Sequence, residues 1–226
     1  MRILMVVTSH DTLGDTGRKT GAWLEEIAAP WAVFKDAGAD IVFASPKGGP
    51  APIDPGSEKQ ESAAVARFRK DAKATAALAK TRPLADVLDE SFDAVFFPGG
   101  HGPLWDLAED RDARRLVESM YAQRKPIGTV CHGAAVFRHA RGPFGMPLVR
   151  GRKVTGFSNT EEAAAGLTES VPFLIEDMLK ENAGHYSKAA DFQPHVVSDG
   201  HVVTGQNPAS SEGTAHAVLD ALARGA

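Results

Sequence analysis

The sequence contains a single cysteine among its 226 residues. One thiol excludes an intramolecular disulfide and a zinc cluster built on cysteines, and it fits a protein of a reducing cytosol. No run of about 18 apolar residues occurs, so we expect no membrane span. The apolar run within residues 2–7 is too short for the core of a secretory signal, and no small-residue cleavage site follows it. These absences predict a soluble, cytoplasmic protein.

An excess of positive charge is also absent. The formal net charge is −4, no block of lysine and arginine occurs, and the chain has no strongly acidic tail. This balance argues against a nucleic-acid-binding protein. What the chain does have is 43% apolar and 24% charged residues, which suits a globular protein with a sizeable core. Its length fits one large domain.

The first part of the chain predicts a β-strand, a helix and a second strand. Residues 2–7 and 39–46 are short runs rich in β-branched and other apolar side chains, and residues 22–38 between them show helical spacing. Pro30 lies inside that helix and is expected to kink or split it. A strand–helix–strand unit implies a parallel sheet with a right-handed crossover.

The rest of the chain continues the alternation of strands and helices. A Pro/Gly-rich stretch and an Ala-rich helix at 61–80 form a surface insertion at about 47–90 in a single domain, 1–226. The remaining pattern predicts strands at 92–100, 125–130 and 151–157, helices at 109–124, 133–140, 159–166 (with Asn159 as a possible cap), 171–184 and 210–223, and a hairpin at 195–205. The expected fold is an α/β parallel-sheet sandwich with helices on both faces.

The one cysteine lies where the predicted strand 125–130 becomes a helix, in the stretch "GTVCHGAAVF". Ligands of open parallel sheets bind beyond the carboxyl ends of the strands, where "TSHD" and "PGGHGP" also lie. The turn partly matches a nucleophile elbow, with Gly133 after Cys131 but Thr129 before it. A helix N-terminus is expected to lower the pKa of Cys131. The alternative is a buried structural cysteine, a common core residue.

Several motifs together resemble the ThiJ/PfpI superfamily, and within it the heat-shock-induced branch of glutathione-independent glyoxalases (glyoxalase III). The stretches "TGAWLEEIAAP", "ASPKGG", "PGGHGPLWDL", "VCHGAAVF", "VTGFSNTEE" and "VTGQNPASS" occur in the order typical of that family. The resemblance covers nearly the whole chain and implies a flavodoxin-like fold with the nucleophile elbow at a strand–helix turn.

The resemblance also implies site residues. The nucleophile corresponds to Cys131 and the adjacent histidine to His132. The acid that orients the histidine corresponds to Glu162, with Glu161 as the alternative one residue away.

A second acid, facing the thiol, corresponds to Glu26, with Glu25 as the competing interpretation. Two adjacent helical residues point about 100° apart, so only one of them can face the site. An ionised Glu26 would repel the thiolate of Cys131 and raise the pKa of the cysteine. We therefore expect burial to keep Glu26 protonated, so that it donates a hydrogen bond to the sulfur. The oxyanion donors correspond to the backbone N–H groups of Gly100 and His132, and His101 is expected to line the pocket.

The activity implied is conversion of methylglyoxal or similar 2-oxoaldehydes to 2-hydroxy acids, with no metal or organic cofactor. The eight histidines are scattered without metal-ligand spacing, so no metal site is expected. The partner is the small aldehyde, with no nucleic acid or membrane, and relatives imply a homodimer. Two alternatives stay open: a holdase chaperone or cysteine-oxidation stress sensor, and a cysteine amidase or peptidase. The insertion at 47–90 is expected to cover the site.

Overall fold

A seven-stranded sheet forms the centre of the molecule. The structure is a computed structural model, and it describes residues 1–225. The strand order is β3-β2-β1-β4-β5-β9-β8, and every neighbouring pair is parallel except β8 and β9. The strands are β1 (Arg2–Val6), β2 (Asp40–Ser45), β3 (Arg82–Pro83), β4 (Ala94–Phe97), β5 (Ile127–Val130), β8 (Val196–Asp199) and β9 (Val202–Gly205). The expected α/β parallel-sheet fold is confirmed.

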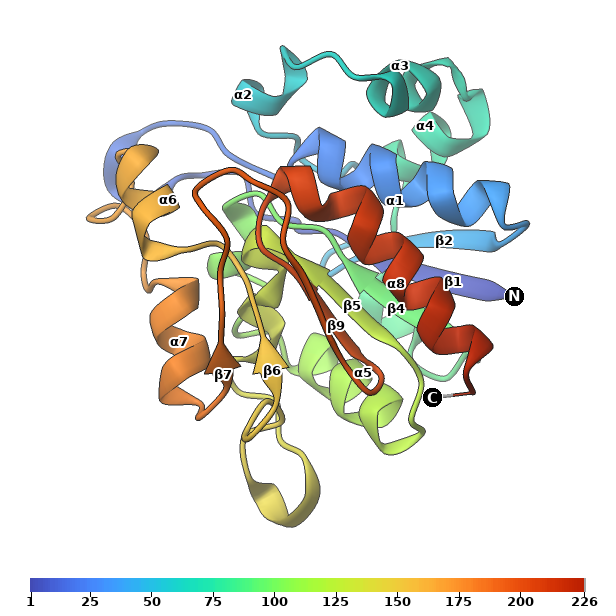
Figure 1. The fold of residues 1–226 in the computed structure, drawn as a ribbon. Helices are drawn as coiled ribbons and strands as arrows, with labels where there is room; N and C mark the ends of the chain where they lie inside the picture. Colours follow the sequence, from blue (N-terminus) through green and yellow to red (C-terminus); the bar gives the residue numbers. More distant parts are fainter. Residues whose placement is uncertain (226) are drawn as a thin grey trace.

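The two faces of the sheet carry separate apolar cores, as the alternation of side chains along a strand requires. In β1, Leu4 and Val6 belong to one core, whereas Ile3 and Met5 belong to the other. All four side chains are fully buried. Helices therefore have to cover both faces, which is the layered arrangement visible in Figure 1.

The helices divide between these faces. On one side α1 (Leu24–Asp36) packs against α8 (Ser211–Ala223) and against α3 (Ala63–Lys70), while α5 (Arg111–Ala122) covers the other side (Figure 1). The remaining helical segments are α2 (Pro55–Glu58), α4 (Ala72–Ala79), α6 (Asn159–Ala164), α7 (Ile175–Glu181) and the 3-10 helices η1 (Gly14–Thr16), η2 (Leu84–Val87), η3 (Gly102–Leu104), η4 (Cys131–Phe137), η5 (Pro143–Gly145) and η6 (Pro208–Ser210).

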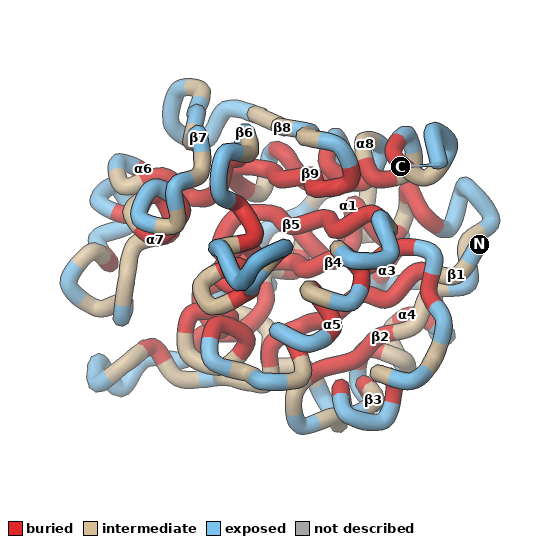
Figure 2. The backbone as a smooth tube through the Cα atoms, turned by 90° about the horizontal axis from the view of Figure 1, so that it is seen from below, coloured by how far each residue is buried: buried red, intermediate tan, exposed pale blue. Residues whose placement is uncertain are grey.

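The backbone of the central strands is buried, and exposed backbone lies at the ends of elements and in loops, as Figure 2 shows. Among residues 1–225, no helix combines the length and the apolar character needed to cross a membrane.

Several local predictions were wrong in detail. The helix expected at 61–80 is broken at Asp71, whose carboxylate caps α4 by accepting the N–H groups of Lys73 and Ala74. Asp71 favours this break because its short side chain competes for backbone donors. Pro30 does not split α1, which is continuous through it. Its fixed φ is compatible with a helix, and burial of the helix outweighs the lost hydrogen bond.

The predictions for residues 151–184 were right about element type but wrong about extent. The strand expected at 151–157 is only β6 (Lys153–Val154), which pairs with β7 (His185–Tyr186) in a small separate sheet that the sequence pattern did not predict. Helix α6 is capped by Ser158 in a capping box, and not by Asn159. The hairpin of β8 and β9 is confirmed.

Candidate active site

The candidate nucleophile follows β5 at the carboxyl edge of the sheet. Cys131 has a φ of 58°, in the left-handed region that is unusual for a residue with a side chain. This is the strained turn of a nucleophile elbow. A Cβ on Gly133 would lie 2.1 Å from the carbonyl oxygen of Phe97 at the end of the neighbouring β4, so only glycine fits there. The close approach brings the loops that follow β4 and β5 together.

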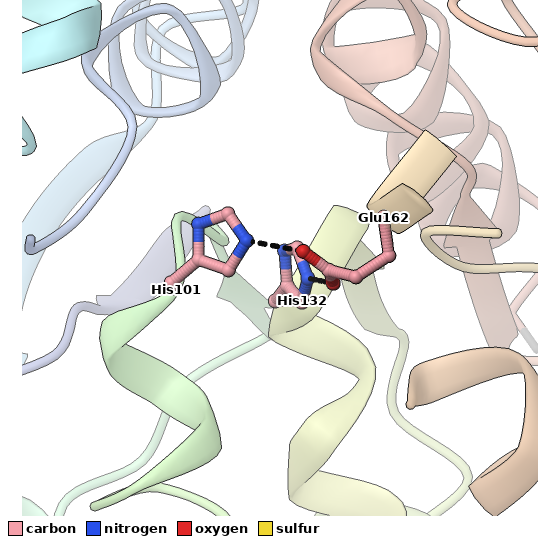
Figure 3. Close-up of side chains that lie close together, drawn as sticks. All are labelled: His101, His132 and Glu162. Atoms are coloured by element: carbon pink, nitrogen blue, oxygen red, sulfur yellow. Dashed lines mark hydrogen bonds and ion pairs between the residues drawn. The ribbon is translucent and has the colours of Figure 1, made fainter. Parts of the chain in front are cut away.

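Two histidines and a glutamate lie close together next to the candidate nucleophile; Figure 3 shows His101, His132 and Glu162. His132 Nδ1 is 3.3 Å from Cys131 Sγ, and His132 Nε2 is 2.5 Å from Glu162 Oε2. The other oxygen of Glu162 lies 2.7 Å from Nε2 of His101. All four side chains are buried. One carboxylate from α6 therefore ties together two histidines that follow different strands.

The charge state of Glu162 determines which nitrogen of His132 carries a proton. Burial alone would raise the pKa of Glu162. At the low pH where Glu162 titrates, the positive charge of His132 and the hydrogen bonds from both histidines outweigh burial and hold this pKa well below its usual range. Burial lowers the pKa of His132. An ionised carboxylate only accepts hydrogen bonds, so neutral His132 donates from Nε2. Its Nδ1 is left as an acceptor directed at the thiol.

The structure distinguishes between the two candidate acids in "NTEE". Glu162 faces His132, whereas Glu161 turns away and accepts the backbone N–H of Ser158 at 2.9 Å and the side-chain amide of Asn207 at 2.8 Å. Consecutive helical residues cannot both face one site. Glu161 thus holds the start of α6 and the neighbouring loops in place.

A second glutamate lies on the other side of the thiol. Glu26, in the first turn of α1, is fully buried and accepts the N–H of Gly99 at Oε2, 2.7 Å away. Its Oε1 is buried with no hydrogen-bond partner among the described residues, and the carboxyl lies near enough to Cys131 to raise the pKa of the thiol. Burial raises the pKa of Glu26 to about 8. Glu25 points elsewhere and accepts a hydrogen bond from Ser62.

The thiol is neutral at rest, contrary to the expectation from a helix N-terminus. Burial and the neighbouring Glu26 raise the pKa of Cys131 well above its ordinary value. Residues 131–137 form a 3-10 helix rather than the expected α-helix, so the aligned dipoles that would stabilise a thiolate are few. Proton transfer must therefore accompany any attack by sulfur.

Backbone donors also approach the thiol. Gly100 has a φ of 87° and lines the cavity together with His101, Cys131 and His132. The backbone N–H of His132 lowers the pKa of the Cys131 thiol and so opposes part of the rise caused by burial. A Cβ built on Gly99 would lie 2.8 Å from the His132 nitrogen, which shows how closely the two backbones approach. The peptide groups of Gly100 and His132 are thus placed beside the same cavity, as an oxyanion site requires.

The site opens into a cavity of about 710 Å³. Most of its wall was not among the predicted catalytic and oxyanion residues, although the insertion was expected to cover the site. Phe157 lies beside His132, with ring centroids 4.5 Å apart. The wall also includes Leu13, Arg18, Lys19, Trp23, Asp54, Pro55, Gly56, Gln60, Ala165, Leu167, Phe192, Asn207, Pro208 and Ala209. Loop positions such as Phe192 have no sequence periodicity by which to recognise them.

The histidine–glutamate cluster also has the spacing of a metal site, which sequence spacing did not predict. Ligand atoms of His101, His132 and Glu162 all lie within 4.8 Å of one another. Two histidines and one carboxylate suit a zinc-type ion. Such an ion would take Nε2 of His132 and so replace the hydrogen bond to Glu162 that fixes the histidine tautomer.

Solved structures share this fold along the whole chain. Rapid Encystment Protein 24 kDa of Francisella tularensis is 39% identical and matches with a TM-score of 0.93, covering 98% of each chain. Glyoxalase III of Candida albicans is 28% identical with a TM-score of 0.88, covering 98% of this chain and 97% of that one.

Curated relatives agree with this result. Glyoxalase 3 of Candida albicans is 29% identical over 237 residues, and glutathione-independent glyoxalase HSP31 of Saccharomyces cerevisiae is 28% identical over 231 residues; each match covers 98% of both chains. The profile of the DJ-1/PfpI family matches residues 19–221. The chain belongs to the DJ-1/PfpI family.

Proposed function

We propose that this protein is a glutathione-independent glyoxalase, which converts methylglyoxal or similar 2-oxoaldehydes to 2-hydroxy acids such as lactate. The observation that carries the proposal is the position of Cys131 between two glutamates of opposite protonation, one acting directly and one through His132. The names of the similar yeast enzymes support the same reaction.

The first step is attack of sulfur on the aldehyde carbon. His132 Nδ1 takes the thiol proton as the C–S bond forms, and the aldehyde oxygen becomes an oxyanion. The N–H groups of Gly100 and His132 stabilise that charge, and the oxygen takes a proton from Glu26 to give a hemithioacetal, which leaves Glu26 ionised. Glu162 stabilises the imidazolium formed during attack.

The second step moves a proton between two substrate carbons. Ionised Glu26 takes the proton from the carbon bonded to sulfur, the released electron pair forms the C=C bond of an enediol, and the ketone oxygen takes its proton from the His132 imidazolium. Glu26 then returns a proton to the neighbouring carbon, while the hydroxyl on the carbon bonded to sulfur loses its proton to Glu26 and becomes the thioester carbonyl. Glu26 is suited to this transfer because its pKa of about 8 lies near neutrality. His132 is the second candidate for the same role. The product is a 2-hydroxyacyl thioester on Cys131, formed without any external oxidant or reductant.

Hydrolysis completes the cycle. Water, deprotonated by His132 with Glu162 orienting the ring, attacks the thioester carbonyl, and the thiolate leaves and takes back a proton. The sum of the steps is one aldehyde and one water converted to one hydroxy acid. No step calls for glutathione, a metal or an organic cofactor.

The neutral thiol argues against a primary role as an oxidation sensor. Oxidation by peroxide requires thiolate character and exposure, whereas Cys131 is 4% exposed and its pKa is raised by burial. A holdase chaperone would not need the thiol of Cys131.

We propose a cytoplasmic, homodimeric enzyme of one domain, with the insertion at about 47–90 covering the cavity. Asp54, Pro55, Gly56 and Gln60 on its wall support that role.

The test is turnover of methylglyoxal without glutathione, followed by loss of aldehyde and formation of lactate. The wild type is expected to form many equivalents of lactate and Cys131→Ser none above background. Aldehyde loss limited to one equivalent, or equal in both proteins, would contradict the proposal. Release of ammonia or peptides from amide substrates would favour the amidase or peptidase instead.

A further inference from the structure

The cavity is much larger than the reaction needs. A 2-oxoaldehyde with a methyl substituent fills a small part of about 710 Å³, a volume within the range of pockets that hold drug-sized ligands. Glu26, Gly100, His101, Cys131 and His132 account for one end of the cavity. The rest of the wall takes no part in the reaction steps, so it is available to bind the substituent of a larger substrate.

An apolar surface leads outward from the reacting groups. Phe157 has its ring centroid 4.5 Å from that of His132 and 6.4 Å from that of Phe192. Trp23 and Leu167 line the same cavity. Phe192 is 50% exposed, although an aromatic ring is normally buried. The ring is thus available to a molecule that enters the cavity.

Phe192 is also held in place by a buried carboxyl group. Its φ of 59° lies in the left-handed region, which a bulky residue rarely adopts. Its N–H donates to Oε1 of Glu161 over 2.8 Å, and the same oxygen accepts from the side chain of Asn207. Glu161 is fully buried. Because this carboxylate fixes a strained backbone, the ring keeps its position beside the cavity in the absence of substrate.

We propose that Phe192, together with Phe157, binds the substituent of the substrate, and that the preferred substrates are 2-oxoaldehydes with an aromatic or bulky apolar group in place of methyl. This inference rests on the proposed glyoxalase function. The aldehyde carbon lies at Cys131, while the substituent packs against the two phenylalanine rings in the offset or edge-on arrangements that aromatic groups prefer. Glu161 is a positioning residue, acting through the backbone of Phe192.

The experiment compares kcat/KM for phenylglyoxal and for methylglyoxal. The wild type is expected to prefer phenylglyoxal by about tenfold or more, since even a single methylene in an apolar pocket gives discrimination of about tenfold or more. Phe192→Ala should lower the ratio of the two values by about tenfold, and Phe192→Leu, which keeps apolar bulk, by less. Comparing this ratio between variant and wild type removes the difference in intrinsic reactivity between the two aldehydes.

Phe144 provides a matched control. It has the same φ of 59° but is fully exposed, in η5 outside the cavity. Phe144→Ala should leave the ratio unchanged. An unchanged ratio in Phe192→Ala, or an equal fall in Phe144→Ala, would overturn the inference. Melting temperatures of the variants show whether each remains folded, and Phe192→Leu serves if the alanine variant does not.

The positioning role of Glu161 has a separate readout. Glu161→Gln is expected to raise KM for phenylglyoxal more than KM for methylglyoxal, a difference that a general loss of folded protein or a shift of α6 would not produce. Equal effects on the two aldehydes would contradict the role.

Failure of the inference is distinguishable from failure of the proposed function. If the wild type turns over methylglyoxal but shows no preference for the aryl substrate, only the inference fails. If neither aldehyde is turned over, the glyoxalase proposal fails. Calorimetry with mandelate and lactate, the two products, then decides about the apolar surface: tighter mandelate binding that Phe192→Ala weakens supports it, and equal binding overturns it.

Discussion

The two glutamates that flank Cys131 are both buried, yet they are in opposite protonation states. Glu26 receives one backbone N–H and faces a neutral thiol, and burial raises its pKa to about 8. Glu162 receives hydrogen bonds from two histidines, which hold its pKa below the usual range despite burial. Burial therefore does not by itself determine the charge of a carboxyl group. The number and the charge of its hydrogen-bond donors determine whether its pKa rises or falls.

This difference divides the chemistry between the two sides of the thiol. An ionised Glu162 fixes the tautomer of His132 and stabilises positive charge on it, as the acid of a catalytic triad does. A protonated Glu26 can donate to sulfur or oxygen and can exchange a proton with substrate near neutral pH. The same residue type thus serves as a fixed anion on one side and as an acid or base on the other.

Glu162→Gln should have the largest effect among changes to the two glutamates. The amide can donate as well as accept, so it can stabilise the wrong tautomer of His132, with the proton on Nδ1 facing the sulfur. We expect kcat to fall by about 10³–10⁴-fold, as for the acid of a serine protease triad. Steady-state kinetics with the preferred aldehyde measures this. A fall of less than about tenfold would show that His132 does not depend on Glu162.

Glu26→Gln is expected to lower kcat by about 10²–10³-fold, because general acid–base catalysis contributes in this range. It should also lower the pKa of Cys131, since one source of repulsion is removed, and so speed alkylation by iodoacetamide at pH 8 to 9. Glu25→Gln is the matched control, because its side chain is half-buried and bonds to Ser62 outside the site. Equal losses in both variants would contradict the role of Glu26.

His101→Phe removes one of the two histidine donors to Glu162 and keeps a ring of similar shape. The pKa of Glu162 should rise but stay acidic, since the bond from His132 remains. We expect kcat to fall by about tenfold, the effect of losing one charge-assisted hydrogen bond of about 1.5 kcal/mol. A loss as large as that of Glu162→Gln would place His101 in the reaction itself.

Among these predictions, the change in the free energy of unfolding with pH should be the smallest effect, and its direction follows from the raised pKa of Glu26. Between about pH 4.5 and pH 8, folded Glu26 keeps a proton that the unfolded chain has lost, so this group makes stability fall as pH rises. The slope is at most about 1.4 kcal/mol per pH unit. Glu162, with its lowered pKa, acts in the opposite direction, and its contribution is lost as pH falls below about 4.5.

Denaturant unfolding of the wild type and Glu26→Gln across this pH range measures the first contribution. Stability of the wild type should decline relative to the variant toward pH 8. Parallel curves would mean that Glu26 is already ionised in the folded protein.

The sequence predicted the layers of the fold because the apolar runs and helical periodicities are strong at β1, β2, α1 and α8. It did not predict the break at Asp71, where one side-chain cap overrides a continuous Ala-rich pattern. It left open whether Pro30 would kink or split the first helix, and the structure excludes the split. Short β7 depends on a neighbour distant in sequence, which local pattern does not reveal.

The candidate site was predictable through the motifs that carry the family resemblance, but its charges were not. "NTEE" offers two adjacent acids, and only the rotation of α6 shows that Glu162 faces His132. The direction of the Cys131 pKa depends on burial and on Glu26, which lies 105 residues earlier in the chain (131 minus 26). Phe192 comes from a loop, where no periodicity indicates which side chain faces the cavity.

The most direct test of opposite protonation is infrared spectroscopy of the carboxyl groups at pH 7. The account predicts a carbonyl band of a protonated, buried carboxyl that is present in the wild type and in Glu162→Gln and absent from Glu26→Gln. Taking the difference between wild type and variant removes any contribution from Asp106, whose pKa is also raised by burial. A wild-type spectrum identical to that of Glu26→Gln, or a band lost in Glu162→Gln instead, would contradict it.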